Sequence, residues 1–116
     1  MRHENLYLTD IVEAADDIAR FLIGVEAQSF QESDLLRSAV VHKLSVIGEA
    51  AARLSDELKD RNPQVQWAQI VGFRNILIHA YFGIDWDVVW EAAREGCTIL
   101  REQVALILAA ESSQPE

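Results

Sequence analysis

Apolar residues recur at alternating steps of three and four through most of this chain, and this spacing constrains the fold more than any other feature. The first stripe consists of Leu8, Ile11, Ala15, Ile18, Leu22 and Val25. Such steps place successive side chains on one face of an α-helix. No segment sustains the period-two alternation, bounded by turns, that indicates β-hairpins. The sequence therefore predicts an all-α fold.

Three more stripes predict three further helices. The second helix is expected to begin after the N-cap candidate Ser33, to continue through Leu58 and to end before Pro63. A short third helix is expected between Trp67 and Tyr81, ahead of Gly83. The fourth helix is predicted over residues 86–107, with Asp85 as its cap.

Four helices joined by short connections favour an antiparallel four-helix up-down bundle. A chain of 116 residues, half of them hydrophobic, has the size of one domain with one core. We assign residues 1–110 to this domain and predict that the polar residues 111–116 form a disordered tail.

The net charge of -9 argues against a protein that coats nucleic acid by bulk electrostatic attraction, so any RNA contact must be local. The single cysteine, Cys97, leaves no intrachain disulfide framework. No signal peptide is recognisable, and no apolar run reaches the roughly 18 residues of a membrane span. We therefore expect a cytoplasmic protein.

Arg74 is the exceptional residue of the third stripe, because it lies near the middle of the apolar face. Burial of an unpaired guanidinium costs on the order of several kcal/mol in folding free energy, so Arg74 requires a partner. That partner can be a carboxylate within the chain, a polar cleft, a second subunit or a phosphate. An internal ion pair is the purely structural alternative.

Asn75 and His79 lie four residues apart and therefore on one edge of the predicted helix, beside Arg74, and Tyr81 follows. A histidine alone is more often a structural residue than a catalytic one. The polar residues around His79 favour a site.

Other polar and aromatic residues carry weaker signals. Glu49 falls off the main stripe, which favours solvent or a second contact surface over catalysis. His3 and His42 have no partners at a recognised ligand spacing, so we predict neither a metal nor a cofactor. The tryptophans occupy stripe positions, where core or dimer packing is commoner than base stacking; they are Trp67, Trp86 and Trp90.

The segment RNILIHAYF has an arginine, four residues, a histidine, one residue and a tyrosine. With YLTDIVEAADDIARFLIG, LSVIGEAAARLS, PQVQWAQIVGFRN and a following DxxxVW, it resembles the HepT-like family of the HEPN superfamily. The resemblance covers nearly the whole chain, and the ordered set of motifs is more specific than the arginine-to-histidine spacing alone.

This resemblance implies a homodimer and a metal-independent endoribonuclease with Arg74 and His79 as catalytic residues and Asn75 in support. It implies the toxin of a type VII-like toxin-antitoxin system, acting on RNA and not on DNA. The implied partner is a minimal nucleotidyltransferase antitoxin that transfers AMP to Tyr81. The alternative is a non-catalytic HEPN partner of a nucleotidyltransferase.

The residue types suit this chemistry, because RNA cleavage without a metal needs proton transfer and stabilisation of a charged phosphorane. His79 could move protons, and Arg74 could hold two phosphoryl oxygens. The motif supplies one histidine per chain, so a site that needs both an acid and a base would gain from two protomers.

Overall fold

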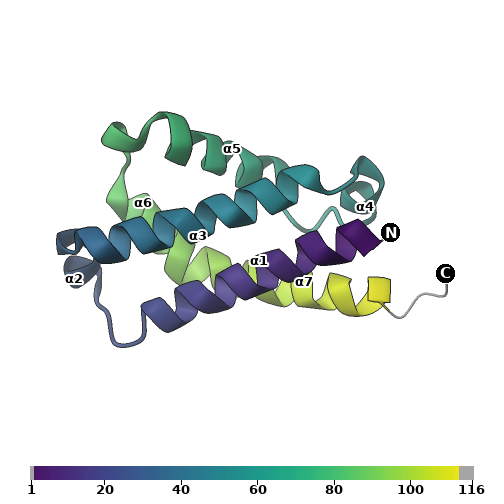
Figure 1. Cartoon of the computed structure of the whole chain (residues 1–116), viewed down its shortest axis with the longest axis horizontal. Coiled ribbons are helices and arrows are strands. Elements are labelled where there is room, and N and C mark those ends of the chain that lie inside the picture. The colour runs from purple at the N-terminus through teal and green to yellow at the C-terminus, as the bar shows by residue number, and fades with distance from the viewer. Residues whose placement is uncertain (1, 113–116) are drawn as a thin grey trace.

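The computed structural model describes residues 2–112, which contain helices and no strand, so the all-α prediction is confirmed. The longer helices alternate in direction along the molecule (Figure 1). They are α1 (Arg2–Phe21), α3 (Asp34–Arg53), α5 (Trp67–His79) and α7 (Cys97–Ser112). The shorter elements are α2 (Ala27–Glu32), α4 (Asp56–Arg61), the 3-10 turn η1 (Tyr81–Gly83), α6 (Trp86–Glu91) and the π-helical turn η2 (Ala92–Gly96).

The core lies where α1 packs against both α3 and α7 (Figure 1). The first predicted stripe forms one wall of this core, since Leu8, Ile11 and Ile18 are fully buried. Val40, Leu44 and Ile47 of the second stripe face them from α3. Burial of each such side chain contributes about 1.5–3 kcal/mol, which explains why the three-and-four spacing determines the helix faces.

The prediction of one long second helix is wrong, because the backbone becomes extended at Leu54 and Ser55. The Ser55 hydroxyl accepts a hydrogen bond from the Leu58 amide at 3.1 Å and so caps α4. The Ser55 amide and hydroxyl donate in turn to the Glu4 carboxylate of α1, at 2.8 and 2.7 Å. A contact between distant segments therefore ends α3 at Arg53.

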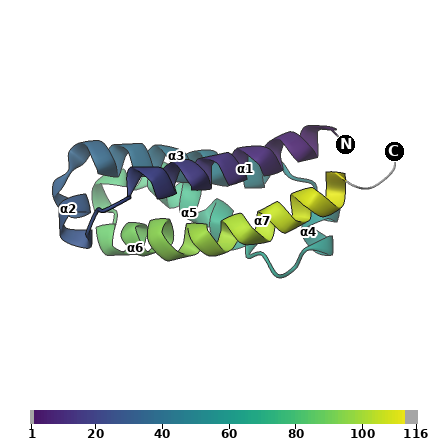
Figure 2. The same cartoon turned by 90° about the horizontal axis from the view of Figure 1, so that it is seen from below.

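A short helix, α2, occupies part of the segment that we expected to be a connection. It is built around Phe30, whose side chain is completely buried. The predicted cap after it is confirmed, since the Ser33 hydroxyl accepts a hydrogen bond from the Leu36 amide at 3.1 Å. The helices α2 and α4 lie at opposite ends of the molecule (Figure 2).

The predicted fourth helix is interrupted by a π-helical turn, so α6, η2 and α7 follow one another without a loop. The Asp85 side chain accepts a hydrogen bond from the Asp87 amide at 3.0 Å, as expected for its N-cap. Residues 111 and 112 belong to α7, although the disordered tail was predicted to begin at 111. The rest of that predicted tail, 113–116, lies outside the described residues.

The four-helix bundle prediction describes this arrangement incompletely. The helices α1 and α3 pack against each other, as do α3 and α5 and also α1 and α7, but α5 and α7 barely contact each other within the part of the chain that the structure describes. A seam between α5 and α7 therefore stays open. No helix among residues 2–112 is long and apolar enough to cross a membrane.

Candidate functional site

Arg74 lies where α5 crosses α3 at close range. A Cβ atom added to Gly48 would stand 2.2 Å from the Arg74 Cβ and 2.6 Å from its Cγ. Only glycine allows such an approach, because it has no side chain. Gly48 thus lets the base of the Arg74 side chain rest directly on α3, and 20% of that side chain remains exposed.

Glu49, the residue after Gly48, forms an ion pair with Arg74. The same carboxylate accepts a hydrogen bond from the Arg53 Nε at 3.0 Å, and this contact is the main cause that raises the pKa of Arg53. Of the partners that the sequence allowed for Arg74, the structure provides the carboxylate within the chain. The pair is not sealed, because 47% of the Glu49 side chain is exposed.

The sequence pattern predicted that Glu49 faces solvent or a second contact surface, and it did not indicate the ion pair between Glu49 and Arg74. A signal was available, because a guanidinium on the apolar face of α5 requires a partner, and an acid on a neighbouring helix is one of those it can use. The Arg74 Nε remains buried without a hydrogen-bond partner. Arg74 is therefore held by one carboxylate while part of its donor capacity is unused.

His79 is the last residue of α5, and both His79 and Asn75 one turn earlier are exposed. Residues five apart on a helix differ in direction by about 140°, so Arg74 faces α3 while His79 faces solvent. A single chain therefore presents the guanidinium and the imidazole on different sides of α5.

Tyr81 lies in η1, directly after α5, and is half-buried. Its ring meets Trp86 edge-on, with centroids 5.8 Å apart and planes at 82°. It meets Phe82 in the same manner, at 5.8 Å and 83°. The motif tyrosine thus contacts two aromatic rings.

Arg37 of α3 belongs to this aromatic environment, and sequence reasoning missed it. Its guanidinium carbon lies 5.0 Å from the centre of the Trp86 ring, a favourable cation–π geometry. Its Nε is buried without a hydrogen-bond partner, and its contact with the exposed Asp34 is long, at 3.7 Å. No sequence pattern pairs residues so far apart in the chain.

All three tryptophans pack against the core, in line with the structural role predicted for them. Trp67 is buried, and its indole Nε1 donates to the Asn62 carbonyl at 3.1 Å. Trp90 lies 5.3 Å from the buried ring of Phe30.

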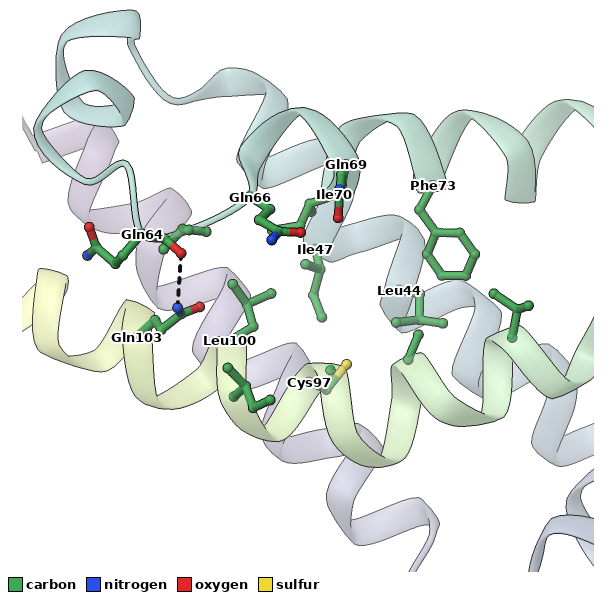
Figure 3. A pocket seen from close by; sticks show the side chains of 15 residues that line it. Leu44, Ile47, Gln64, Gln66, Gln69, Ile70, Phe73, Cys97, Leu100 and Gln103 are labelled. Atoms are coloured by element: carbon green, nitrogen blue, oxygen red, sulfur yellow. Dashed lines mark hydrogen bonds between the residues drawn. The ribbon is translucent and has the colours of Figure 1, made fainter.

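An apolar groove with a volume of about 530 Å³ follows the seam between α5 and α7 (Figure 3). Leu44, Ile47, Cys97 and Leu100 line it together with Phe73, and glutamines line one end. Burial raises the pKa of the Cys97 thiol to about 12, so this thiol is a poor nucleophile near neutral pH. Of the side chains that the structure describes, none that lines the groove is charged.

Metal-ligating residues do not gather within residues 2–112. Among the residues that the structure describes, no group of three or more His, Cys, Asp or Glu side chains could hold a metal ion. His42 is exposed on α3, and the side chain of His3 lies outside those described. The groove between α5 and α7 is not lined by Arg74 or His79 either.

The chain is similar to known proteins over nearly its whole length. Residues 11–107 match the family model described as "Ribonuclease HepT-like". A Methanocaldococcus jannaschii protein named "Putative RNase MJ1380" is 34% identical over 91% of this chain and 97% of its own. "Probable ribonuclease HepT" of Thermococcus cleftensis is 34% identical over 82% of this chain and 86% of its own. No solved structure matches the chain.

Proposed function

The chain belongs to the HepT-like ribonuclease family, and from this membership we propose that it is an endoribonuclease that cleaves RNA without a metal ion. The observation that carries the proposal is an exposed His79 five residues after Arg74, whose carboxylate partner is itself half-exposed. Both groups can reach a ligand from solvent without unfolding of the core.

In the proposed reaction, the 2′-oxygen of a ribose attacks the adjacent phosphorus, and the bond to the 5′-oxygen of the next nucleotide breaks. A base removes the 2′-hydroxyl proton and an acid protonates the departing 5′-oxygen, leaving a 2′,3′-cyclic phosphate. His79 serves in proton transfer, and Arg74 stabilises the charged phosphorane. Asn75, one turn before His79, orients the substrate or the imidazole.

Arg74 must exchange its carboxylate for a phosphate during this reaction. A phosphodiester offers two anionic oxygens in a geometry that a guanidinium binds well. Glu49 is half-exposed and keeps Arg53 as a second partner, so it can release Arg74 without becoming an unpaired buried charge. The pair with Glu49 is therefore compatible with an active enzyme.

We further propose that the active form is a homodimer. One chain supplies a single motif histidine and directs it away from Arg74, so a second copy can complete an acid–base pair. Ile76 and Ile78, beside His79, are 55% and 52% exposed, and the open α5–α7 seam adds further apolar surface. A twofold contact along α5 would cover these side chains and bring two motifs together.

The proposed biological role is that of a cytoplasmic toxin in a type VII-like toxin-antitoxin system, silenced by a minimal nucleotidyltransferase. That enzyme would transfer AMP from ATP to the Tyr81 oxygen, with release of pyrophosphate and the phenolic proton. Tyr81 lies two residues after His79, so the added phosphate would repel RNA beside the catalytic residues.

The test compares wild type with His79→Ala and Arg74→Ala. We expect RNA cleavage and growth arrest with the wild type and loss of both with each variant, while circular dichroism and dimer mass stay unchanged. Cleavage that persists in both folded variants would reject the assigned site.

A non-catalytic partner of a nucleotidyltransferase is the second candidate, and the net charge of -9 together with the Arg74–Glu49 pair favours it. Under this alternative, the protein binds the nucleotidyltransferase but expression causes no arrest that depends on His79. The same expression experiment therefore separates the two candidates.

A further inference from the structure

Phe82 is the most exposed large apolar residue described here, with a relative exposure of 102%. It lies in η1, three residues after His79. Among the side chains that the structure describes, no other aromatic residue belongs to the exposed large hydrophobic set. Its ring leans edge-on against Tyr81, which in turn rests on Trp86. A supported aromatic ring thus projects into solvent beside the motif.

The charge of the chain makes such a ring important for an RNA-cleaving enzyme. A net charge of -9 repels the phosphate backbone at long range, so general electrostatic attraction cannot hold the substrate. Asp85 and Asp87, which follow Phe82 closely in the chain, are both exposed. The binding energy must therefore come from short-range contacts, and base stacking on an aromatic side chain is the principal uncharged contact that single-stranded RNA offers.

We propose that Phe82 stacks on a base of the RNA substrate next to the phosphodiester that is cleaved. The inference rests on the proposed function and adds the residue that sets the position of the strand. Phe82 follows His79 by three positions, which limits their Cα distance to about 11 Å. The stacked base therefore belongs to a nucleotide at, or next to, the reacting bond.

The surroundings of Phe82 favour RNA over a protein partner. Gly83, Asp85 and Asp87 after it are exposed and not apolar, and Ile84 among them is partly buried against the core. Phe82 is also absent from the lining of the apolar groove between α5 and α7. A ring that projects fully into solvent suits a flat base, which needs one aromatic face and no enclosing pocket.

The experiment measures binding of a fluorescent, mixed-sequence 12-nucleotide RNA with 2′-O-methyl groups, which cannot react because the attacking hydroxyl is blocked. We expect Phe82→Ala and Phe82→Leu to raise the Kd by about 5- to 150-fold, the usual effect of losing one stacked base. Phe82→Trp should stay within about twofold of wild type, because indole stacks at least as well. Leu35→Ala, at a 79% exposed position on α3, is the matched control and should leave the Kd unchanged.

A second arm uses unmodified RNA that carries abasic nucleotides around the mapped cleavage site. Removal of the stacked base should raise KM for wild type and have little further effect on Phe82→Ala. The folded state of each variant is checked by its thermal unfolding midpoint, which a fully exposed side chain should hardly change.

The outcomes separate this inference from the proposed function. If wild type neither binds nor cleaves RNA, both are rejected. If wild type cleaves RNA and Phe82→Ala does so with the same Kd and KM, only the stacking role is rejected. If Phe82→Leu retains wild-type affinity, or if Phe82→Ala instead loses dimerisation or nucleotidyltransferase binding, the ring is a protein contact and the inference is overturned.

Discussion

Substitution of Gly48 by alanine tests the close crossing of α3 and α5 that positions Arg74. The new methyl group would lie 2.2 Å from the Arg74 Cβ and 3.4 Å from the Ile70 carbonyl oxygen. Packed carbon atoms stay at least about 3.5 Å apart, so the two helices must separate locally by roughly 1.3 Å. The shift acts on the residue that is proposed to bind the phosphate.

Two opposing effects determine the change in the free energy of unfolding. Overpacking costs about 1–3 kcal/mol, whereas alanine in place of glycine within a helix stabilises by about 1 kcal/mol. Gly48→Ala should therefore lower the free energy of unfolding by about 0–2 kcal/mol. Gly72→Ala in α5 is the matched control, because nothing lies within 4 Å of its added Cβ, and it should gain about 1 kcal/mol.

Urea unfolding of both variants, followed by circular dichroism, measures these values, and a cleavage assay on the same samples measures activity. The difference between the variants should be about 1–3 kcal/mol, and Gly48→Ala alone should lose activity, by up to about 100-fold for a 1 Å displacement. If Gly48→Ala is stabilised as much as Gly72→Ala and cleaves RNA normally, the close-crossing argument is refuted.

Four further predictions follow from single contacts. Glu49→Gln should lower KM for RNA, because it removes the carboxylate that competes with phosphate for Arg74. It should change the free energy of unfolding by no more than about 1 kcal/mol, since the Arg74–Glu49 pair is partly exposed. The Cys97 thiol should resist iodoacetamide at pH 8 until urea unfolds the chain, because burial raises its pKa to about 12. The unfolded chain loses this proton at a lower pH than the folded one, so the free energy of unfolding should fall as pH rises from about 9 towards 12. Ser55→Ala should cost about 1–2 kcal/mol in urea unfolding through loss of the α4 cap. Mass spectrometry after co-expression with the nucleotidyltransferase should show an added AMP that Tyr81→Phe lacks; a mass gain in that variant would place the modification elsewhere.

The helices α1, α3 and α7 could be predicted from sequence because each buries a stripe of apolar side chains. Ile11 and Val104 are buried as their spacing requires. The break at Ser55 could not be predicted in this way, since it depends on Glu4, some fifty residues earlier in the chain. Short α2 was missed because six residues around Phe30 give too few apolar positions for a period.

The candidate site shows the same division between local and distant information. The sequence identified Arg74 as a charge on an apolar face and limited its possible partners, and the structure then supplied Glu49. The cation–π contact of Arg37 with Trp86 was beyond reach, because it joins α3 to α6 across the fold. The catalytic roles of Arg74 and His79 stay predictions that the proposed variants can test.

Within the described range 2–112, the groove between α5 and α7 is lined without a single charged side chain, although a quarter of the residues in the chain are charged. Ionic strength should therefore distinguish RNA binding from the association of two chains along this groove. Added salt screens the contact between Arg74 and a phosphate, whereas it leaves apolar pairing along the groove unchanged or, with sulfate, strengthens it. A titration with ammonium sulfate should thus weaken the ionic part of RNA binding while any dimer formed along the seam persists.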